Sequence, residues 1–145
     1  MQKNVSWVGV ADGTKLSSLS LPFYLSRITA GFPSPAQDYV ERQLDLNELC
    51  IKHPSATFFV QVEGDSMCEA GIYAGDILVV DRSLQARHGD IVVAYLLGEF
   101  TVKQLQLRPV IQLLARNKNY PPIEITEESQ LDIFGVVASV VRQLR

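Results

Sequence analysis

From Thr57 to the end of the chain, short runs of β-branched and aromatic residues alternate with tight turn signals. Such side chains favour extended backbone, while Gly, Asp and Pro mark turns. Several short strands joined by tight connections imply a mostly β fold with antiparallel pairing. We therefore expect short antiparallel strands over most of the chain. The expected strands are Thr57–Val62, Ile77–Val80, Ile91–Tyr95, Phe100–Leu107, Val110–Leu114 and Leu131–Val141.

The chain is long enough for one folded domain, or for one domain and an arm. Of its 145 residues, 47% are hydrophobic and 20% are charged, which argues against global disorder. The formal net charge is −3, which excludes a strongly basic nucleic-acid surface over the whole chain. The longest unbroken apolar run, Ile91–Leu97, is far shorter than the roughly 20 residues of a membrane-spanning helix. We therefore expect a soluble, cytoplasmic protein without a membrane segment.

The residue pattern gives little support to metal or cofactor chemistry, and we expect neither. Cys50 and Cys68 fit a reducing cytoplasm as small core residues. His53 and His88 lie at expected turns, so a zinc site and a Ser-His-Asp triad are both disfavoured. The sequence contains no phosphate-binding glycine loop and no dinucleotide fingerprint. Carboxylates near the turns are expected to be solvated or capping groups; these are Asp65, Asp76, Asp81 and Asp90.

The first 31 residues differ from the rest, because they carry three basic residues against one acidic residue. Their polar middle, Gly13–Ser20, is typical of a loop. Two short apolar patches, Trp7–Val10 and Leu21–Leu25, cannot fold alone and are expected to pack on the body of the protein. The prolines of Gly31–Pro35 then predict an exposed, non-helical hinge. Beyond it, Asp45 is expected to cap a short helical turn.

The motif Gly64-Asp65-Ser66-Met67 comes just after an expected strand, at a turn that contains glycine. A serine on such a bend can be displayed, with neighbouring backbone N–H groups available to an oxyanion. Serine in a turn more commonly serves the turn itself. The motif alone therefore leaves both interpretations of Ser66 open.

Lys103 lies within the expected strand Phe100–Leu107, where alternation places it on one face with Thr101 and Leu105. If that face is buried, desolvation lowers the pKa of the lysine from about 10.4 toward neutrality. A neutral lysine can act as a general base. The alternative is a lysine that extends its ammonium group to water while its stem covers apolar surface.

A series of motifs runs in order through residues 31–145. They are Gly31-Phe32-Pro33-Ser34-Pro35, Asp45-Leu46-Asn47, His53-Pro54-Ser55-Ala56-Thr57, Gly64-Asp65-Ser66-Met67, His88-Gly89-Asp90-Ile91-Val92, Gly98-Glu99-Phe100-Thr101-Val102-Lys103, Leu105-Gln106-Leu107-Arg108-Pro109 and Phe134-Gly135-Val136-Val137. Together they resemble the UmuD-type mutagenesis proteins, which are relatives of the LexA-type self-cleaving repressors. The resemblance implies a LexA/signal-peptidase-like β-fold with an extended N-terminal arm, and it does not extend to the residues before Leu21.

In the family that the chain resembles, a serine and a lysine form a catalytic dyad that cuts the protein's own chain at a small-residue–glycine bond upstream. The matching positions are Ser66, Lys103 and the Ala30–Gly31 bond. The resemblance also implies an oxyanion site at the backbone N–H groups of Asp65 and Ser66. Self-cleavage would remove residues 1–30 as an arm from a domain of residues 31–145. We expect Ser66 Oγ and Lys103 Nζ to lie roughly 2.6–3.2 Å apart, with the lysine buried away from any carboxylate.

The resemblance further implies a role in the DNA-damage (SOS) response. A recombinase filament on single-stranded DNA would stimulate cleavage, and the shortened chain would dimerise and join an error-prone Y-family DNA polymerase for translesion synthesis. Two alternatives are a non-catalytic polymerase-binding accessory module and a phage-type repressor fragment. The residues ahead of the Ala30–Gly31 bond are too few for a helix-turn-helix domain, so direct sequence-specific DNA binding is not expected.

Overall fold

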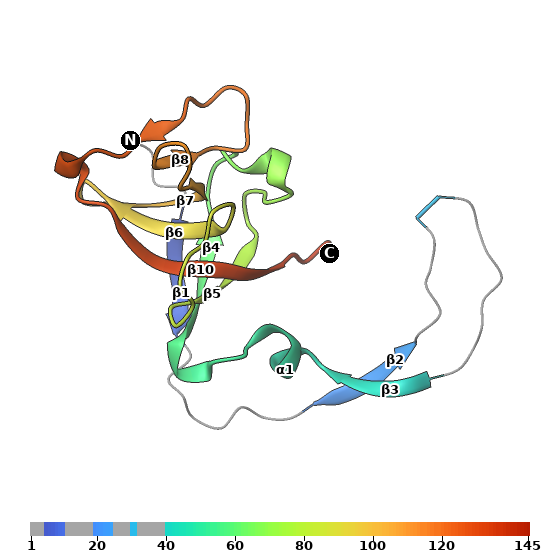
Figure 1. Cartoon of the computed structure of the whole chain (residues 1–145). Helices are drawn as coiled ribbons and strands as arrows, with labels where there is room; N and C mark the ends of the chain where they lie inside the picture. The colour runs from blue at the N-terminus through green and yellow to red at the C-terminus, as the bar shows by residue number, and fades with distance from the viewer. Residues whose placement is uncertain (1–4, 11–18, 25–29, 32–39) are drawn as a thin grey trace. The chain divides into compact units, whose positions relative to one another are not determined.

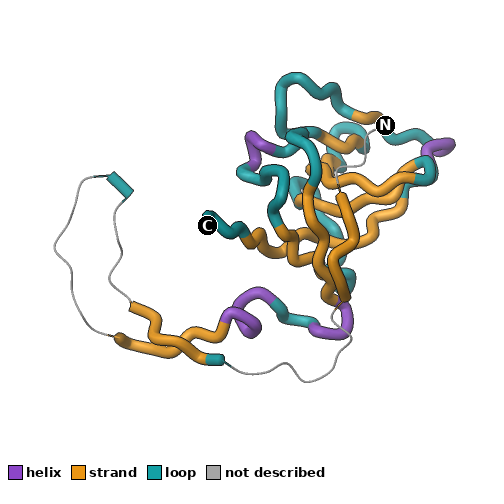
Figure 2. Tube along the Cα trace, turned by 180° about the vertical axis from the view of Figure 1, so that it is seen from behind, coloured by secondary structure: helices purple, strands orange, loops and turns teal. Residues whose placement is uncertain are grey.

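A computed structural model of the chain describes residues 5–10, 19–24, 30–31 and 40–145. The chain divides into two compact units, one of residues 1–14 and 53–145 and one of residues 15–52. Strands predominate among the described elements, as Figures 1 and 2 show. The strands are β1 (Val5–Val10), β2 (Ser20–Tyr24), β3 (Val40–Asp45), β4 (Thr57–Val62), β5 (Ile77–Asp81), β6 (Ile91–Leu96), β7 (Glu99–Gln106), β8 (Gln112–Leu114), β9 (Ile123–Glu124) and β10 (Asp132–Val141). The helical elements are α1 (Leu46–Cys50) and three 3₁₀ turns, Pro54–Ala56, Cys68–Ala70 and Glu127–Ser129.

The larger unit contains one eight-stranded sheet with the order β1-β4-β5-β10-β6-β7-β8-β9. Every neighbouring pair is antiparallel, which confirms the expected fold class. The long strand β10 joins the two halves, because it pairs with β5 through one half of its length and with β6 through the other. The sheet curls around its own interior (Figure 1). Among the described residues, no helix has the length and apolar character needed to cross a membrane.

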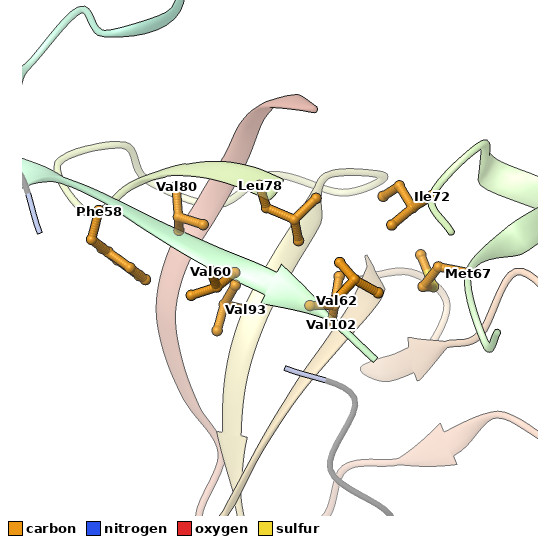
Figure 3. Close-up of a cluster of buried hydrophobic side chains, with 9 residues drawn as sticks. All are labelled: Phe58, Val60, Val62, Met67, Ile72, Leu78, Val80, Val93 and Val102. Carbon is orange, nitrogen blue, oxygen red and sulfur yellow. The ribbon is translucent and has the colours of Figure 1, made fainter. Parts of the chain in front are cut away.

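Alternation along the strands places one set of side chains inside the curled sheet. On β4, the side chains of Phe58, Val60 and Val62 are buried and belong to one hydrophobic cluster. Figure 3 shows how residues of this cluster from several strands meet, together with Met67 and Ile72 from the loop after β4. A second cluster forms around Val92, Leu105 and Leu113. The fold is therefore held by apolar burial on both faces of β6, since Val93 belongs to the first cluster and Val92 to the second.

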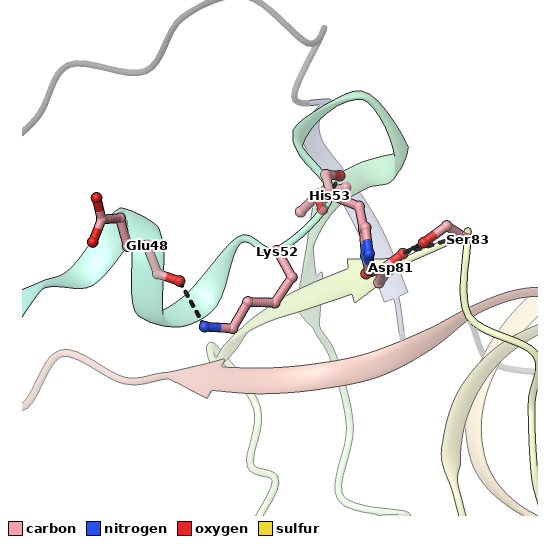
Figure 4. Close-up of polar contacts among 6 residues, drawn as sticks. Glu48, Lys52, His53, Asp81 and Ser83 are labelled. Carbon is pink, nitrogen blue, oxygen red and sulfur yellow. Dashed lines mark hydrogen bonds and ion pairs between the residues drawn. The ribbon is translucent and has the colours of Figure 1, made fainter.

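In the smaller unit, β2 and β3 form a two-stranded antiparallel sheet, in which Leu21 pairs with Leu44. Asp45, at the end of β3, caps α1: its carboxylate accepts a hydrogen bond from the Asn47 N–H at 2.9 Å. This confirms the cap predicted from the sequence. Lys52 Nζ donates to the carbonyl of Glu48 at 2.8 Å, near the end of this helix (Figure 4).

The expected strands from Thr57 onward are confirmed to within two residues at each end. Four strands were not expected: β1, β2, β3 and β9. Strand β1 pairs along β4, with Ser6 opposite Gln61, so the first apolar patch of the arm does pack on the body. Most of the expected loop Gly13–Ser20 and of the hinge Gly31–Pro35 lies outside the described residues, and Ser20 begins β2. The division at residue 30 depends on a cleavage event and stays a prediction.

Candidate active site

Lys103 is placed at the centre of β7, where it pairs with Val92 of the neighbouring β6. Only 7% of the residue is exposed, so the alternative of a lysine that extends its ammonium group to water is wrong. Its Nζ donates to Thr101 Oγ1 at 2.7 Å, to the Val102 carbonyl at 3.1 Å and to Ser66 Oγ at 3.2 Å. All three acceptors are uncharged. Burial lowers the pKa of Lys103 from 10.5 to about 8, because desolvation disfavours the ammonium form.

Ser66 lies in the loop between β4 and β5. Gly64 opens this loop with a φ of 81°, a left-handed conformation that glycine adopts without strain. Ser66 is 6% exposed, and its Oγ lies against the Lys103 ammonium group. The expected distance between the two side chains and the expected burial of Lys103 are therefore confirmed. Among the described residues, Lys103 forms no ion pair with a carboxylate.

The core explains why these two side chains meet although 37 positions separate them in the sequence. Met67 follows Ser66 and Val102 precedes Lys103, and both neighbours are buried in the same hydrophobic cluster (Figure 3). Met67 is 2% exposed and Val102 is completely buried. Apolar burial thus fixes the backbone next to each polar side chain, and the hydrogen bond between Ser66 and Lys103 forms at the edge of a packed core.

A second segment, residues 116–120 between β8 and β9, holds the loop that carries Ser66. The Arg116 N–H donates to the Ser66 carbonyl at 2.8 Å, and the Glu69 N–H donates to the Arg116 carbonyl at 2.8 Å. Asn117 Nδ2 donates to the Asp65 carbonyl at 2.9 Å, and the Tyr120 hydroxyl donates to Asp65 Oδ1 at 2.7 Å. Hydrogen bonds from residues 116–120 therefore hold the backbone on either side of Ser66.

Sequence reasoning placed Thr101 on the same face of the strand as Lys103 but gave it no role. Their i, i+2 spacing would have predicted that the two side chains lie close together. The contacts of Arg116 and Asn117 could not be predicted, because about 50 positions separate these residues from the loop that they hold. The two predicted oxyanion donors, the N–H groups of Asp65 and Ser66, lie in this loop, and their role stays a prediction.

Ala30 and Gly31 are described as a short bend, and both residues are exposed. The pair belongs to the smaller unit, whereas Ser66 and Lys103 belong to the larger one. Their role as the cleaved bond stays a prediction.

The other titratable groups singled out in the sequence do not join Ser66 and Lys103. His53 Nδ1 lies 2.6 Å from Asp81 Oδ2, and Asp81 also accepts from the Ser83 hydroxyl at 2.6 Å (Figure 4). Burial alone would raise the pKa of Asp81, but the hydrogen bonds from Ser83 and His53 outweigh it and hold this pKa below its ordinary value. His88 Nδ1 accepts the N–H of Leu107 at 2.9 Å. Among the described residues, no group of three or more His, Cys, Asp or Glu side chains could hold a metal ion.

Asp76 and Asp81 were expected to be solvated or to cap turns. Both do cap turns, since Asp76 accepts the Tyr73 N–H and Asp81 accepts the Ser83 N–H, each at 2.8 Å, but neither is solvated. Asp76 is 1% exposed and Asp81 is 4% exposed. Asp76 accepts two hydrogen bonds from Arg142, from Nε and from Nη2, each at 2.6 Å. These hydrogen bonds hold the pKa of Asp76 below its ordinary value. A cavity of about 680 Å³ is lined in part by Asp76 and Arg142, and neither Ser66 nor Lys103 lines it.

Comparison with known proteins shows that the chain is similar to one family. A family model described as Peptidase S24-like matches residues 22–138. Protein MucA from Salmonella typhimurium is 55% identical over 119 residues, which cover 81% of this chain and 82% of the relative. Protein ImpA from Escherichia coli is 47% identical over 135 residues, 93% of this chain and 92% of the relative. A LexA repressor from Shewanella woodyi is 38% identical over 140 residues, 93% of this chain but only 66% of the relative.

Proposed function

Since the chain belongs to the Peptidase S24-like family of serine–lysine self-cleaving peptidases, as a UmuD-type member, we propose that Ser66 and Lys103 cut its own Ala30–Gly31 bond. The observation that carries this proposal is the 3.2 Å distance between Lys103 Nζ and Ser66 Oγ inside a buried environment. The same burial lowers the pKa of Lys103 to about 8, so a neutral amine is available under mildly alkaline conditions.

The chemistry proceeds in two steps. Neutral Lys103 accepts the hydroxyl proton of Ser66, and Ser66 Oγ attacks the carbonyl carbon of Ala30. The resulting oxyanion accepts hydrogen bonds from the backbone N–H groups of Asp65 and Ser66. As the intermediate collapses, the C–N bond to Gly31 breaks and the Lys103 ammonium group returns its proton to the leaving amine. Water then attacks the carbonyl carbon of the Ala30 ester while Lys103 accepts one of its protons. The bond from that carbon to Ser66 Oγ breaks, Lys103 returns the proton to Ser66 Oγ, and the arm leaves with a free Ala30 carboxylate.

We further propose that cleavage serves the SOS response in the cytoplasm. A recombinase filament on single-stranded DNA stimulates the reaction, and residues 31–145 then act as a dimeric accessory subunit of an error-prone Y-family polymerase for translesion synthesis. The relationship to MucA and ImpA supports this role at the level of the family. The net charge of −3 supports contact with DNA through protein partners, because phosphate binding by the protein itself would need a basic surface.

The test is to incubate the purified full chain at pH 9–10, or at neutral pH with a recombinase filament, and to follow its mass. We expect loss of residues 1–30 alone, and no cleavage in Ser66→Ala or Lys103→Ala. Cleavage of Ser66→Ala at the rate of the unaltered chain would remove Ser66 from the mechanism. An intact mass together with retained polymerase binding would instead support the non-catalytic accessory module.

A further inference from the structure

The side chain of Asn117 contacts the backbone of the loop that carries Ser66, at the peptide group just before the serine. Its Nδ2 donates to the carbonyl of Asp65 at 2.9 Å, across 52 positions of sequence, and the Cys68 N–H of the same loop donates to this carbonyl at 3.2 Å. Asn117 is 8% exposed, which is unusual for an amide side chain without a structural or functional task. It therefore occupies a buried place beside the site, and it is not part of the dyad.

Both ends of the Asn117 amide are engaged, so its orientation is determined. Oδ1 accepts the N–H of Asn119 at 3.0 Å, while Nδ2 faces the carbonyl of Asp65. A flipped amide would place a carbonyl oxygen against the Asp65 carbonyl and an amino group against the Asn119 N–H, and both contacts would be repulsive. Asn117 is therefore a fixed donor to the Asp65 carbonyl.

Fixing that carbonyl also fixes the N–H of Ser66. The Asp65 carbonyl and the Ser66 N–H belong to one planar trans peptide group, in which C=O and N–H point in opposite directions. With the carbonyl directed at Asn117, the Ser66 N–H points to the other side of the loop. The Arg116 N–H holds the next carbonyl, that of Ser66, at 2.8 Å, so both peptide groups that flank the serine are held from the same segment.

We propose that Asn117 is a positioning residue for self-cleavage, which aims the Ser66 N–H at the oxyanion of the Ala30 tetrahedral intermediate. This inference rests on the proposed function and adds a residue that the dyad alone does not include. Tyr120 contacts the same loop differently: its hydroxyl donates to the side chain of Asp65 and leaves the peptide group untouched. Tyr120→Phe is therefore a matched control from the same segment.

Two variants of the full chain separate the two hydrogen bonds of Asn117, the one from Nδ2 to the Asp65 carbonyl and the one from the Asn119 N–H to Oδ1. Asn117→Asp retains an oxygen for the Asn119 N–H but loses the donor to Asp65, whereas Asn117→Ala loses both. We expect both variants to lose about tenfold in the maximal rate of self-cleavage, less than the 10²–10³-fold typical of removing an oxyanion donor outright, because the Ser66 N–H is still present and the Cys68 N–H still holds the Asp65 carbonyl. Tyr120→Phe should retain the rate within about threefold. Urea unfolding shows which variants are folded. If Asn117→Ala does not fold, the rate of the nearly isosteric Asn117→Asp decides the test.

The pH profile distinguishes positioning from a loosened site. In Asn117→Ala, the midpoint of the rate profile should stay near that of the unaltered chain while its height falls, because the burial of Lys103 is unchanged. A midpoint that moves toward 10.5 would mean that the site has opened to water, and it would overturn the inference. A loss in Asn117→Ala but not in Asn117→Asp would assign the effect to the hydrogen bond from the Asn119 N–H and would also overturn it.

The same series separates this inference from the proposed function. If the unaltered chain is cut at Ala30–Gly31 and Ser66→Ala is not, the proposed function holds whatever the Asn117 variants do. Wild-type rates in both Asn117 variants would then remove only the positioning role. Cleavage that does not depend on Ser66 would remove both.

Discussion

Lys103 Nζ lies 2.7 Å from Thr101 Oγ1, which is closer than its 3.2 Å distance to Ser66 Oγ. Thr101 and Lys103 are both buried, and they are two positions apart on β7, so their side chains share one face of the strand. The threonine hydroxyl thus fixes the amine in the position from which it reaches the serine.

Thr101→Val removes that hydroxyl at nearly constant volume. We expect the maximal rate of self-cleavage to fall about fivefold, because the amine loses one hydrogen bond of about 1 kcal/mol that orients it. The rate is measured by the loss of intact mass in the full chain. Thr57→Val is the matched control, since Thr57 is a buried threonine whose hydroxyl donates to the His53 carbonyl. Equal losses in the two variants would show a general effect of removing a buried hydroxyl.

Self-cleavage should depend on pH through Lys103. Because the neutral amine is the reactive form and its pKa is about 8, the rate should rise about tenfold per pH unit below 8 and level off above it. The measurement is the rate between pH 6 and 10.5 in the absence of any filament. A rate that continues to rise up to pH 10.5 would indicate a lysine with its ordinary pKa, and therefore a solvated amine.

The same burial has a cost in stability at neutral pH. The pKa of Lys103 is lower in the folded chain than in the unfolded chain, so between about pH 8 and 10.5 the unfolded chain binds more protons. Stability therefore rises with pH across this window, and the lysine is least favourable to folding below pH 8. Lys103→Met removes this dependence. In a Ser66→Ala background, which prevents cleavage, we expect the variant to gain at most about 3 kcal/mol on the parent at pH 7, because the pKa of Lys103 falls from 10.5 in the unfolded chain to about 8 in the folded one.

The difference between the two chains should shrink as the pH approaches 10.5, because the parent lysine is then neutral in the folded chain and increasingly neutral in the unfolded one. Urea unfolding at pH 7, 8.5 and 10 measures this difference. A difference that is constant with pH would mean that packing, and not the buried charge, separates the variant from its parent.

Local patterns predicted most of the strands, because alternation and turn residues act within a few positions. The pairing of Ser66 with Lys103 was predicted through resemblance to a family; the residues by themselves allowed a turn serine and a lysine that extends its ammonium group to water. What could not be predicted depends on contacts between distant positions. Asp76 was expected to be solvated or to cap a turn; it caps one, and its burial becomes favourable only when Arg142, 66 positions later, pairs with it. Strand β1 likewise becomes a strand through its register with β4.

The pair of Asp76 and Arg142 gives a last prediction, on how the end of β10 is held. Besides its two contacts with Asp76, the Arg142 guanidinium donates to the Gly71 carbonyl at 2.7 Å and lies over the Tyr73 ring. Arg142→Gln leaves the buried carboxylate of Asp76 without its cation, so we expect a lower urea midpoint at pH 7. Arg145→Gln, at the exposed end of the chain, is the control with the same charge change.

The effect of Arg142→Gln should decline in acid. The pKa of Asp76 is held below 3.8 in the folded chain, chiefly by the hydrogen bond from Arg142, so this stabilisation is present above the unfolded pKa and is lost as pH falls through the folded one. Urea unfolding at pH 7, 5 and 3 should therefore show a gap between the variant and its parent that is full at pH 7 and 5 and smaller at pH 3. An undiminished gap at pH 3 would assign the loss to the contacts of Arg142 with Gly71 and Tyr73, because these do not titrate with Asp76.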